Sequence, residues 1–210
     1  MPSADRKRGS GGRRIAVVAI AAAAVVTFSL FVVRRNGAGP CASIRTELTA
    51  PDEWRTAPLV RSELVVSQTS IGTFSSSPSS PFVMAVNTGG DVVVAAPYQN
   101  GSPTYRRARL TDASVDALRR CVESPSFQGL AAAYPDPAVS AVTCGVADAA
   151  TTRIVAGATS GSSKSVSAYA LGSARGECAP PAALSDLHTA LVGIRDAVAE
   201  NGLPTGPPEI

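Results

Sequence analysis

The sequence contains few residues of the kinds that usually perform catalysis or bind metals. Its 210 residues include one histidine, His188, and two lysines, Lys7 and Lys164, against seventeen arginines. None of the four cysteines lies in a C-x-x-C motif, and G-x-S-x-G, P-loop and G-x-G-x-x-G motifs are missing. These absences argue against a zinc site, a dithiol redox site, a nucleotide-binding loop and an α/β-hydrolase nucleophile. We therefore expect no metal and no cofactor.

Charge is also scarce, and it is unevenly placed along the chain. The formal net charge is +3, but residues 1–35 hold seven Lys/Arg and one Asp and so carry +6. Residues 36–210 hold twelve Lys/Arg and fifteen Asp/Glu and carry −3. This acidic balance gives the larger part of the chain no electrostatic reason to bind nucleic acid.

A long apolar run is the most informative feature that is present. Residues 15–33, from Ile15 to Val33, read IAVVAIAAAAVVTFSLFVV and contain no ionisable side chain. A helix of nineteen residues would be about 28 Å long, close to the ~30 Å hydrocarbon core of a bilayer. The flanks carry five basic residues before the run and two after it: Arg6, Lys7, Arg8, Arg13 and Arg14, then Arg34 and Arg35. They predict a cytoplasmic N-terminus and a single-pass membrane anchor for an extracytoplasmic domain.

Three other export signals fit the sequence less well. A cleaved signal peptide needs small residues directly after its apolar core, where this chain has Arg34 and Arg35. A lipid-modified Cys41 would need a small residue before it, but Pro40 stands there and Ala38 takes the apolar position. The adjacent arginines before the run are ordinary topology signals. We therefore divide the chain into a basic tail (1–14), a transmembrane helix (15–33), a linker (34–58), a domain (59–202) and a disordered tail (203–210).

The exported part predicts an α+β domain. A leading strand is expected over 59–69, a first hairpin over 82–87 and 92–96, an extended piece over 105–110, and a second hairpin over 151–156 and 165–171. Gly89 and Gly90 suit the first hairpin turn. Serine-rich residues 67–81 and residues 97–103 are expected to be loops.

Two amphipathic helices complete the prediction. The first should begin at the N-cap Thr111, with apolar residues at Val115, Leu118 and Val122, and should end or break at Pro125. The second carries an apolar stripe and should stop at Asn201 and Gly202; the stripe is Leu184, Leu187, Leu191, Ile194 and Val198. Strands interleaved with such helices predict a mainly antiparallel sheet with both helices packed on one face.

Three segments resemble recurring parts of uncharacterised exported or lipid-anchored proteins of actinobacteria. They read YRRARLTDASVDAL from Tyr105, GVADAATT from Gly145 and VSAYAL from Val166. The resemblance covers about 82–200 and implies a domain of the cell envelope. It implies no activity and no functional residues, and the lipid-attachment motif of many of those proteins is missing here.

The four cysteines all follow the predicted span, which indicates two disulfides in an oxidising compartment. Our preferred pairing joins Cys121 to Cys144, which closes a moderate loop, and leaves Cys41 for Cys178. The alternative follows if the second hairpin turns near Ser160 and Gly161. Cys144 then falls opposite Glu177, beside Cys178, and Cys41 pairs with Cys121.

Catalytic arrangements are hard to assemble from the remaining residues. His188 lies beside the apolar stripe of the last helix, and Asp186 is on another face of that helix, so it cannot orient the ring. A Ser–Lys pair would have to use Lys164, which we expect in a hydrated loop tip where its pKa stays high. Asp136 and Asp148 fit turn positions near strands better than a carboxylate pair.

One cluster suggests a surface for a protein partner. Aromatic and arginine side chains are favoured at interfaces, and they gather here with an asparagine: Tyr98, Asn100, Tyr105, Arg106 and Arg107. Packing of the tyrosines onto the sheet is the alternative. We expect a non-catalytic interaction module of the cell envelope, with an envelope protein as partner. A hydrolase with a Ser–His pair using His188, or a purely structural domain, are the other hypotheses.

Overall fold

The computed structural model describes residues 39–51, 54, 64–71, 82–99, 102–134, 149–157, 161–174 and 176–208. The chain divides into Met1–Ala38 and Gly39–Ile210, and all described residues belong to the second unit. The predicted membrane span, 15–33, therefore lies outside the described residues. Among those that are described, no helix is both long and apolar enough to cross a membrane.

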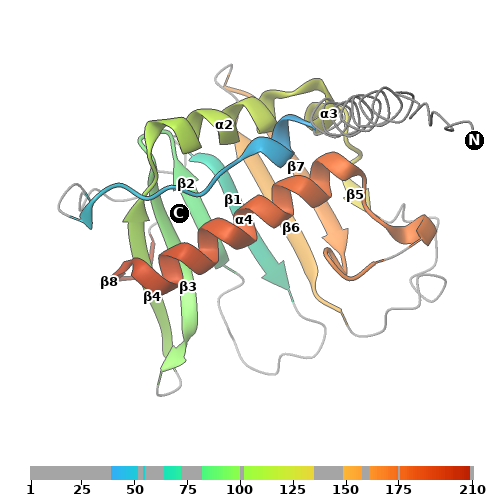
Figure 1. Ribbon diagram of the computed structural model, residues 1–210. Helices are drawn as coiled ribbons and strands as arrows, with labels where there is room; N and C mark the ends of the chain where they lie inside the picture. Colours follow the sequence, from blue (N-terminus) through green and yellow to red (C-terminus); the bar gives the residue numbers. More distant parts are fainter. Residues whose placement is uncertain are drawn as a thin grey trace, which may run out of the picture. The chain divides into compact units, whose positions relative to one another are not determined.

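The described unit is built on one open sheet of eight strands (Figure 1). The strands are β1 (Leu64–Ile71), β2 (Phe82–Asn87), β3 (Asp91–Gln99), β4 (Ser102–Arg109), β5 (Ala133–Tyr134), β6 (Thr151–Gly157), β7 (Ser163–Tyr169) and β8 (Leu203–Thr205). Their order is β5-β7-β6-β1-β2-β3-β4-β8, and every neighbouring pair is antiparallel except β5 and β7. The predicted α+β class with a mainly antiparallel sheet is confirmed.

The first hairpin forms where the glycine turn predicts it. Gly90 has φ +87° and donates its N–H to the carbonyl of Asn87. The Asn87 side chain in turn accepts the N–H of Asp91 at 2.8 Å. A Cβ added to Gly90 would lie 2.8 Å from the carbonyl oxygen of Leu110. Glycine is required here because both the left-handed backbone and the lack of space exclude a side chain.

The prediction that residues 97–103 form a loop is wrong. β3 continues to Gln99 and β4 begins at Ser102, so the two strands form a long hairpin. The pairing is irregular between Ala96 and Gln99. Pro97 has no N–H for the ladder, and such an irregularity lets the strand contain it without losing its partner.

In the part of the chain that the structure describes, three α-helices and two short 3-10 helices accompany the sheet. The α-helices are α2 (Asp112–Glu123), α3 (Pro125–Gln128) and α4 (Ala182–Asn201), and the 3-10 helices are η1 (Pro40–Ser43) and η5 (Gly176–Cys178). Thr111 is the N-cap of α2, where its side chain accepts the N–H of Ser114. α2 ends before Ser124, and Pro125 starts α3. The predicted start and break of the first helix are both confirmed.

α4 buries the residues that the apolar stripe predicts. They are Leu184, Leu187, Leu191, Ile194 and Val198, each with no exposed surface. The helix stops at Gly202, which donates to the carbonyl of Val198 at 2.8 Å. A Cβ on Gly202 would meet that same oxygen at 2.4 Å, so a larger residue does not fit.

The chain beyond α4 corrects our expectation of a disordered tail from 203 onward. Gly202 has an extended backbone, and Leu203–Thr205 form β8 against the free edge of β4. Pro204 is tolerated because an edge strand leaves one side unpaired. β8 therefore covers the part of the β4 edge from Tyr105 to Arg107.

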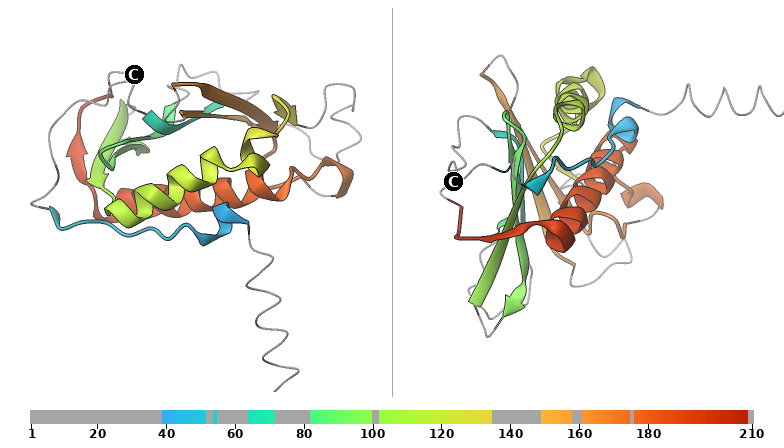
Figure 2. Two further views of the ribbon diagram at one scale, coloured as in Figure 1. Left: turned by 90° about the horizontal axis from the view of Figure 1, so that it is seen from above. Right: turned by 60° about the vertical axis from the view of Figure 1, so that its left-hand side comes forward.

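The helices lie on one face of the sheet (Figure 2). Side chains on that face, such as Met84, Val86 and Ile154, form the main core with the buried stripes of α2 and α4. Residues that alternate with them point to the other face, where Ala85, Val93 and Tyr105 form a second, smaller cluster. The prediction of two amphipathic helices on one face is confirmed, with the short α3 in addition.

Candidate functional site

Residues 39–50, which we call the strap, run between α2 and α4 on the helix-covered side of the sheet (Figure 1). α2 holds one side of the strap. The carbonyl of Glu47 accepts the N–H of Thr111 at 2.9 Å, and Ser114 Oγ donates to the carbonyl of Arg45 at 2.9 Å. The N–H of Thr49 then bonds to Arg109 at the end of β4. A segment expected to be a linker is therefore part of the folded unit.

A disulfide between Cys41 and Cys121 fixes the other end of the strap to α2. Both cysteines are fully buried. Our preferred pairing of Cys121 with Cys144 is therefore wrong, and the bond is the one in the alternative pairing. The physical reason is that Cys121 lies on the buried face of α2, where the strap brings Cys41 against it. Cys178 is also disulfide-bonded, while Cys144 lies outside the described residues.

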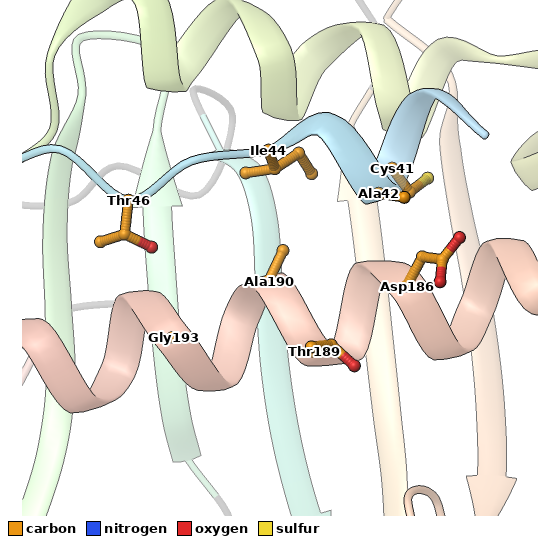
Figure 3. A pocket seen from close by; sticks show the side chains of 8 residues that line it. All are labelled: Cys41, Ala42, Ile44, Thr46, Asp186, Thr189, Ala190 and Gly193. Atoms are coloured by element: carbon orange, nitrogen blue, oxygen red, sulfur yellow. The ribbon is translucent and has the colours of Figure 1, made fainter. Parts of the chain in front are cut away.

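The strap and α4 enclose an open groove with a volume of about 270 Å³ (Figure 3). We call it the strap groove. Its lining comes from the strap on one side and from α4 on the other: Cys41, Ala42, Ile44 and Thr46, and Asp186, Thr189, Ala190 and Gly193. In Figure 3 the Asp186 carboxylate extends from α4 toward Cys41 and Ala42. Among these eight lining residues, Asp186 is the only one with a charged side chain.

Two polar features of the strap groove have no partner among the described residues. The Asp186 side chain makes no ion pair and no hydrogen bond within them. Thr46 likewise makes no hydrogen bond to another described residue, through either its side chain or its main chain. Both residues are partly exposed, so these groups are open to a ligand.

The small residues of α4 shape the floor of the groove. A Cβ added to Gly193 would lie 3.5 Å from Thr46 Oγ1, which shows how closely the strap approaches the helix there. Sequence reasoning missed this site because it followed only the leucine stripe of α4. The available signal was a second set of small residues at helical spacing, Asp186, Thr189, Ala190 and Gly193.

Comparisons with known proteins give no further guide to the strap groove. No protein-family model, curated protein or solved structure matches the chain. The chemistry of the groove must therefore be interpreted from its own residues.

The cluster predicted for a protein partner does not form one surface. Tyr105 is buried, with its ring 6.1 Å from that of Phe82 between centroids. Arg106 points to the helix side, where Nη1 donates to the Gly202 carbonyl at 2.7 Å, while Arg107 forms an ion pair with Asp91 at 3.5 Å. Adjacent strand residues face opposite sides of a sheet, which separates the two arginines.

The two remaining members of that cluster give no support for it. The backbone of Tyr98 belongs to β3, and Asn100 lies outside the described residues. The packing alternative therefore describes Tyr105, and both arginines have partners within the fold.

His188 lies on α4 against Gly172, in the turn that follows β7. A Cβ added to Gly172 would be 3.3 Å from His188 Cε1. Burial, and next the positive charge of Arg195, lower the pKa of His188 below its usual value. No hydrogen bond between His188 and a serine is found in the described part of the chain. The His188 ring is therefore packed against the turn that contains Gly172.

Of the other candidate groups, Lys164 alone lies in the described part of the chain. Lys164 is in β7, not in a loop tip, and its Nζ donates to the carbonyl of Leu130. Asp136 and Asp148 lie outside the described residues. In the described part of the chain, no three His, Cys, Asp or Glu side chains gather as a metal site would require.

Proposed function

We propose that this protein is a membrane-anchored, extracytoplasmic binding module of the cell envelope, and that the strap groove is its binding site. The apolar run 15–33 and its basic flanks support the anchor and its orientation. A disulfide within the described unit supports an oxidising compartment. The resemblance to exported actinobacterial proteins agrees with this location.

One observation carries the assignment of the site. The groove combines a fixed wall with polar groups that the fold leaves unused, Asp186 and the main chain of Thr46. The wall is fixed because the Cys41–Cys121 bond and the hydrogen bonds to Ser114 hold the strap against α2. A site that exists before binding avoids the cost of ordering a loop when the ligand arrives.

Binding is favoured over catalysis because the groove offers one carboxylate and, besides it, only the hydroxyls of Thr46 and Thr189, of which Thr189 already donates to the Ser185 carbonyl. General acid–base or nucleophilic catalysis needs at least two groups placed on the same reacting atoms. His188 lies on another face of α4 and contacts Gly172 instead. The hydrolase hypothesis predicts that His188→Ala abolishes an activity, whereas the binding hypothesis predicts unchanged binding in that variant.

The membrane topology can be tested on intact cells. External protease should remove the 36–210 part of the full chain and leave residues 1–14 protected. A membrane-impermeant thiol reagent should label Cys121 after reduction and denaturation of the cell surface. Failure of the reagent to reach Cys121 would contradict the proposed orientation.

The binding site can be tested by photocrosslinking in native membranes. A photoreactive residue at Ala190, in the groove, should form a specific crosslinked product with the full-length protein. Glu200, an exposed residue near the end of α4, serves as the control position. Asp186→Asn should weaken the product at Ala190, while Asp196→Asn, an exposed change elsewhere on α4, should leave it unchanged. Equal and non-specific labelling at Ala190 and Glu200 would rule out the groove as the binding site.

A further inference from the structure

We infer that the ligand of the strap groove is an extended polypeptide segment that pairs with the main chain of Thr46 and places a lysine or arginine at Asp186. This inference rests on the proposed function, since it names the chemical class that the same groove would bind. It follows from three features of the groove: the direction of its free main-chain groups, its single charge and its small floor.

The strap forms no strand of the sheet, but the main-chain N–H and C=O of Thr46 form an edge that no described residue pairs. Main-chain groups of Arg45 and Glu47 bond toward α2, through Ser114 and Thr111. Alternate residues of an extended chain direct their N–H and C=O groups to opposite sides, so those of Thr46 are directed away from α2. Thr46 makes no hydrogen bond to any described residue.

A peptide strand supplies what such an edge lacks. One residue placed opposite Thr46 in an antiparallel pair would exchange two N–H···O bonds with it. Addition of an extended peptide to an exposed edge is a common mode of recognition, in which main-chain bonds hold the peptide and side-chain pockets select it.

The charge of the groove determines which side chain of the peptide would be bound. Asp186 is the only ionisable residue among the eight that line the groove, and it has no ion-pair partner among the described residues. A cationic side chain on the peptide would neutralise it, whereas an acidic side chain would be repelled. Arginine suits a carboxylate best because its planar group can donate two parallel hydrogen bonds.

The size of the groove favours a single extended strand. Its volume of about 270 Å³ lies just below the roughly 300–1,000 Å³ range of pockets for drug-sized ligands. Ala190 and Gly193 add little or no side chain to the lining, so a backbone can lie along the open side of the groove. A volume of this size takes a short stretch of chain.

The experiment uses the full chain in lipid nanodiscs and a displayed library of random ten-residue peptides. Peptides that bind empty nanodiscs are removed first, and the enriched peptides are sequenced and their affinities measured. We expect enrichment of lysine or arginine at one position, among residues that favour extended structure. A photoreactive residue that replaces Ala190 in the same protein should crosslink to the selected peptides.

Two substitutions separate the two contacts. Asp186→Asn should weaken binding about two- to fivefold, in the range of a partly exposed ion pair, and Asp196→Asn should not. Thr46→Pro removes the main-chain donor, and the fold loses no hydrogen bond because that N–H has no described partner. It should weaken binding about tenfold, whereas Thr46→Val keeps the donor and should bind like the natural protein. Thermal denaturation of each variant reports whether the fold is retained.

Several outcomes would overturn the inference. A selection that yields no peptides above empty nanodiscs would do so. Peptides without a basic residue would also overturn it, as would peptides that bind the Asp186→Asn or the Thr46→Pro variant as tightly as they bind the natural protein. If the Ala190 crosslink in native membranes joins a glycan or a lipid, the groove is a binding site but not for a polypeptide. If Ala190 forms no specific crosslink at all, the proposed function fails together with this inference.

Discussion

Replacing both Cys41 and Cys121 with alanine should destabilise the protein and release the strap. The two cysteines are 80 positions apart in the sequence. For a closed loop of this length the chain-entropy estimate of disulfide stabilisation is about 4.5 kcal/mol. That is a large fraction of the roughly 5–15 kcal/mol that stabilises a typical domain. The double variant is preferable to a reducing agent because it leaves the disulfide of Cys178 intact.

The loss should be visible first at the strap. Trp54, the only tryptophan, is buried, and its indole N–H donates to the carbonyl of Thr49 at 3.1 Å. Its fluorescence therefore reports on the chain just beyond the strap, while circular dichroism reports on the sheet and helices. In the natural protein we expect both signals to change together during chemical denaturation. In the double variant we expect the fluorescence to change at a lower denaturant concentration.

A matched variant removes a different attachment of the same segment. Ser114→Ala deletes the hydroxyl that bonds to Arg45 and Glu47 but keeps the disulfide. It should cost about 1–2 kcal/mol and leave the two transitions together. If the double cysteine variant loses less than about 1 kcal/mol and its transitions still coincide, the disulfide does not hold the strap in the way that we describe.

Three further predictions concern other parts of the fold. Gly90→Ala should lower the free energy of unfolding by about 3 kcal/mol, and Gly161→Ala by about 1 kcal/mol. Both glycines have positive φ, but only Gly90 has a carbonyl oxygen within 3 Å of an added Cβ; equal losses in denaturation experiments would contradict this reasoning. A non-reducing peptide map should link Cys144 to Cys178, since Cys41 and Cys121 pair with each other; a free thiol at either position would refute the link. The lowered pKa of His188 means that the unfolded chain binds its proton more tightly. The contribution of His188 to the free energy of unfolding should therefore be fully present above about pH 6.5 and should decrease as the pH falls through that value. His188→Gln should abolish that part of the pH dependence.

Local patterns in the sequence predict much of this fold. The stripe of α4 is correct to the residue because an amphipathic helix repeats its apolar positions over neighbouring turns. The start of α2 at Thr111 and the turn at Gly90 are also local, since capping and positive φ depend on only a few residues. The strand over 82–87 is correct to the residue for the same reason.

Contacts between distant parts of the sequence explain what could not be predicted. β8 has only three residues, one of them Pro204, and it exists because Gly202 directs the chain to the edge of β4. The pairing of β1 with β6 and the attachment of the strap to α2 likewise join segments far apart in the chain. Loop length favoured Cys144 as the partner of Cys121, but tertiary packing selected Cys41.

The candidate site likewise depends on contacts between distant segments and not on local patterns. Composition identified Arg106 and Arg107 as interface residues, but their partners within the fold depend on the strand's two faces. The strap groove joins residues 41–46 to residues 186–193, so no single segment contains it. Only the spacing of small residues along α4, from Asp186 to Gly193, could have indicated one of its two walls.

The sequence positions of the two groove walls have a consequence for how the protein is made. In the proposed topology, synthesis and export would run from the N-terminus, and the strap would leave the membrane before any other part of the described unit. Cys121 would emerge 80 residues after Cys41, and during that interval the Cys41 thiol would be open to oxidation or to wrong pairing. Once the bond has formed, the strap and α2 are joined while α4 has still to be synthesised. The groove is therefore completed only when the last helix docks, so a chain stopped before α4 would present the strap with no opposite wall.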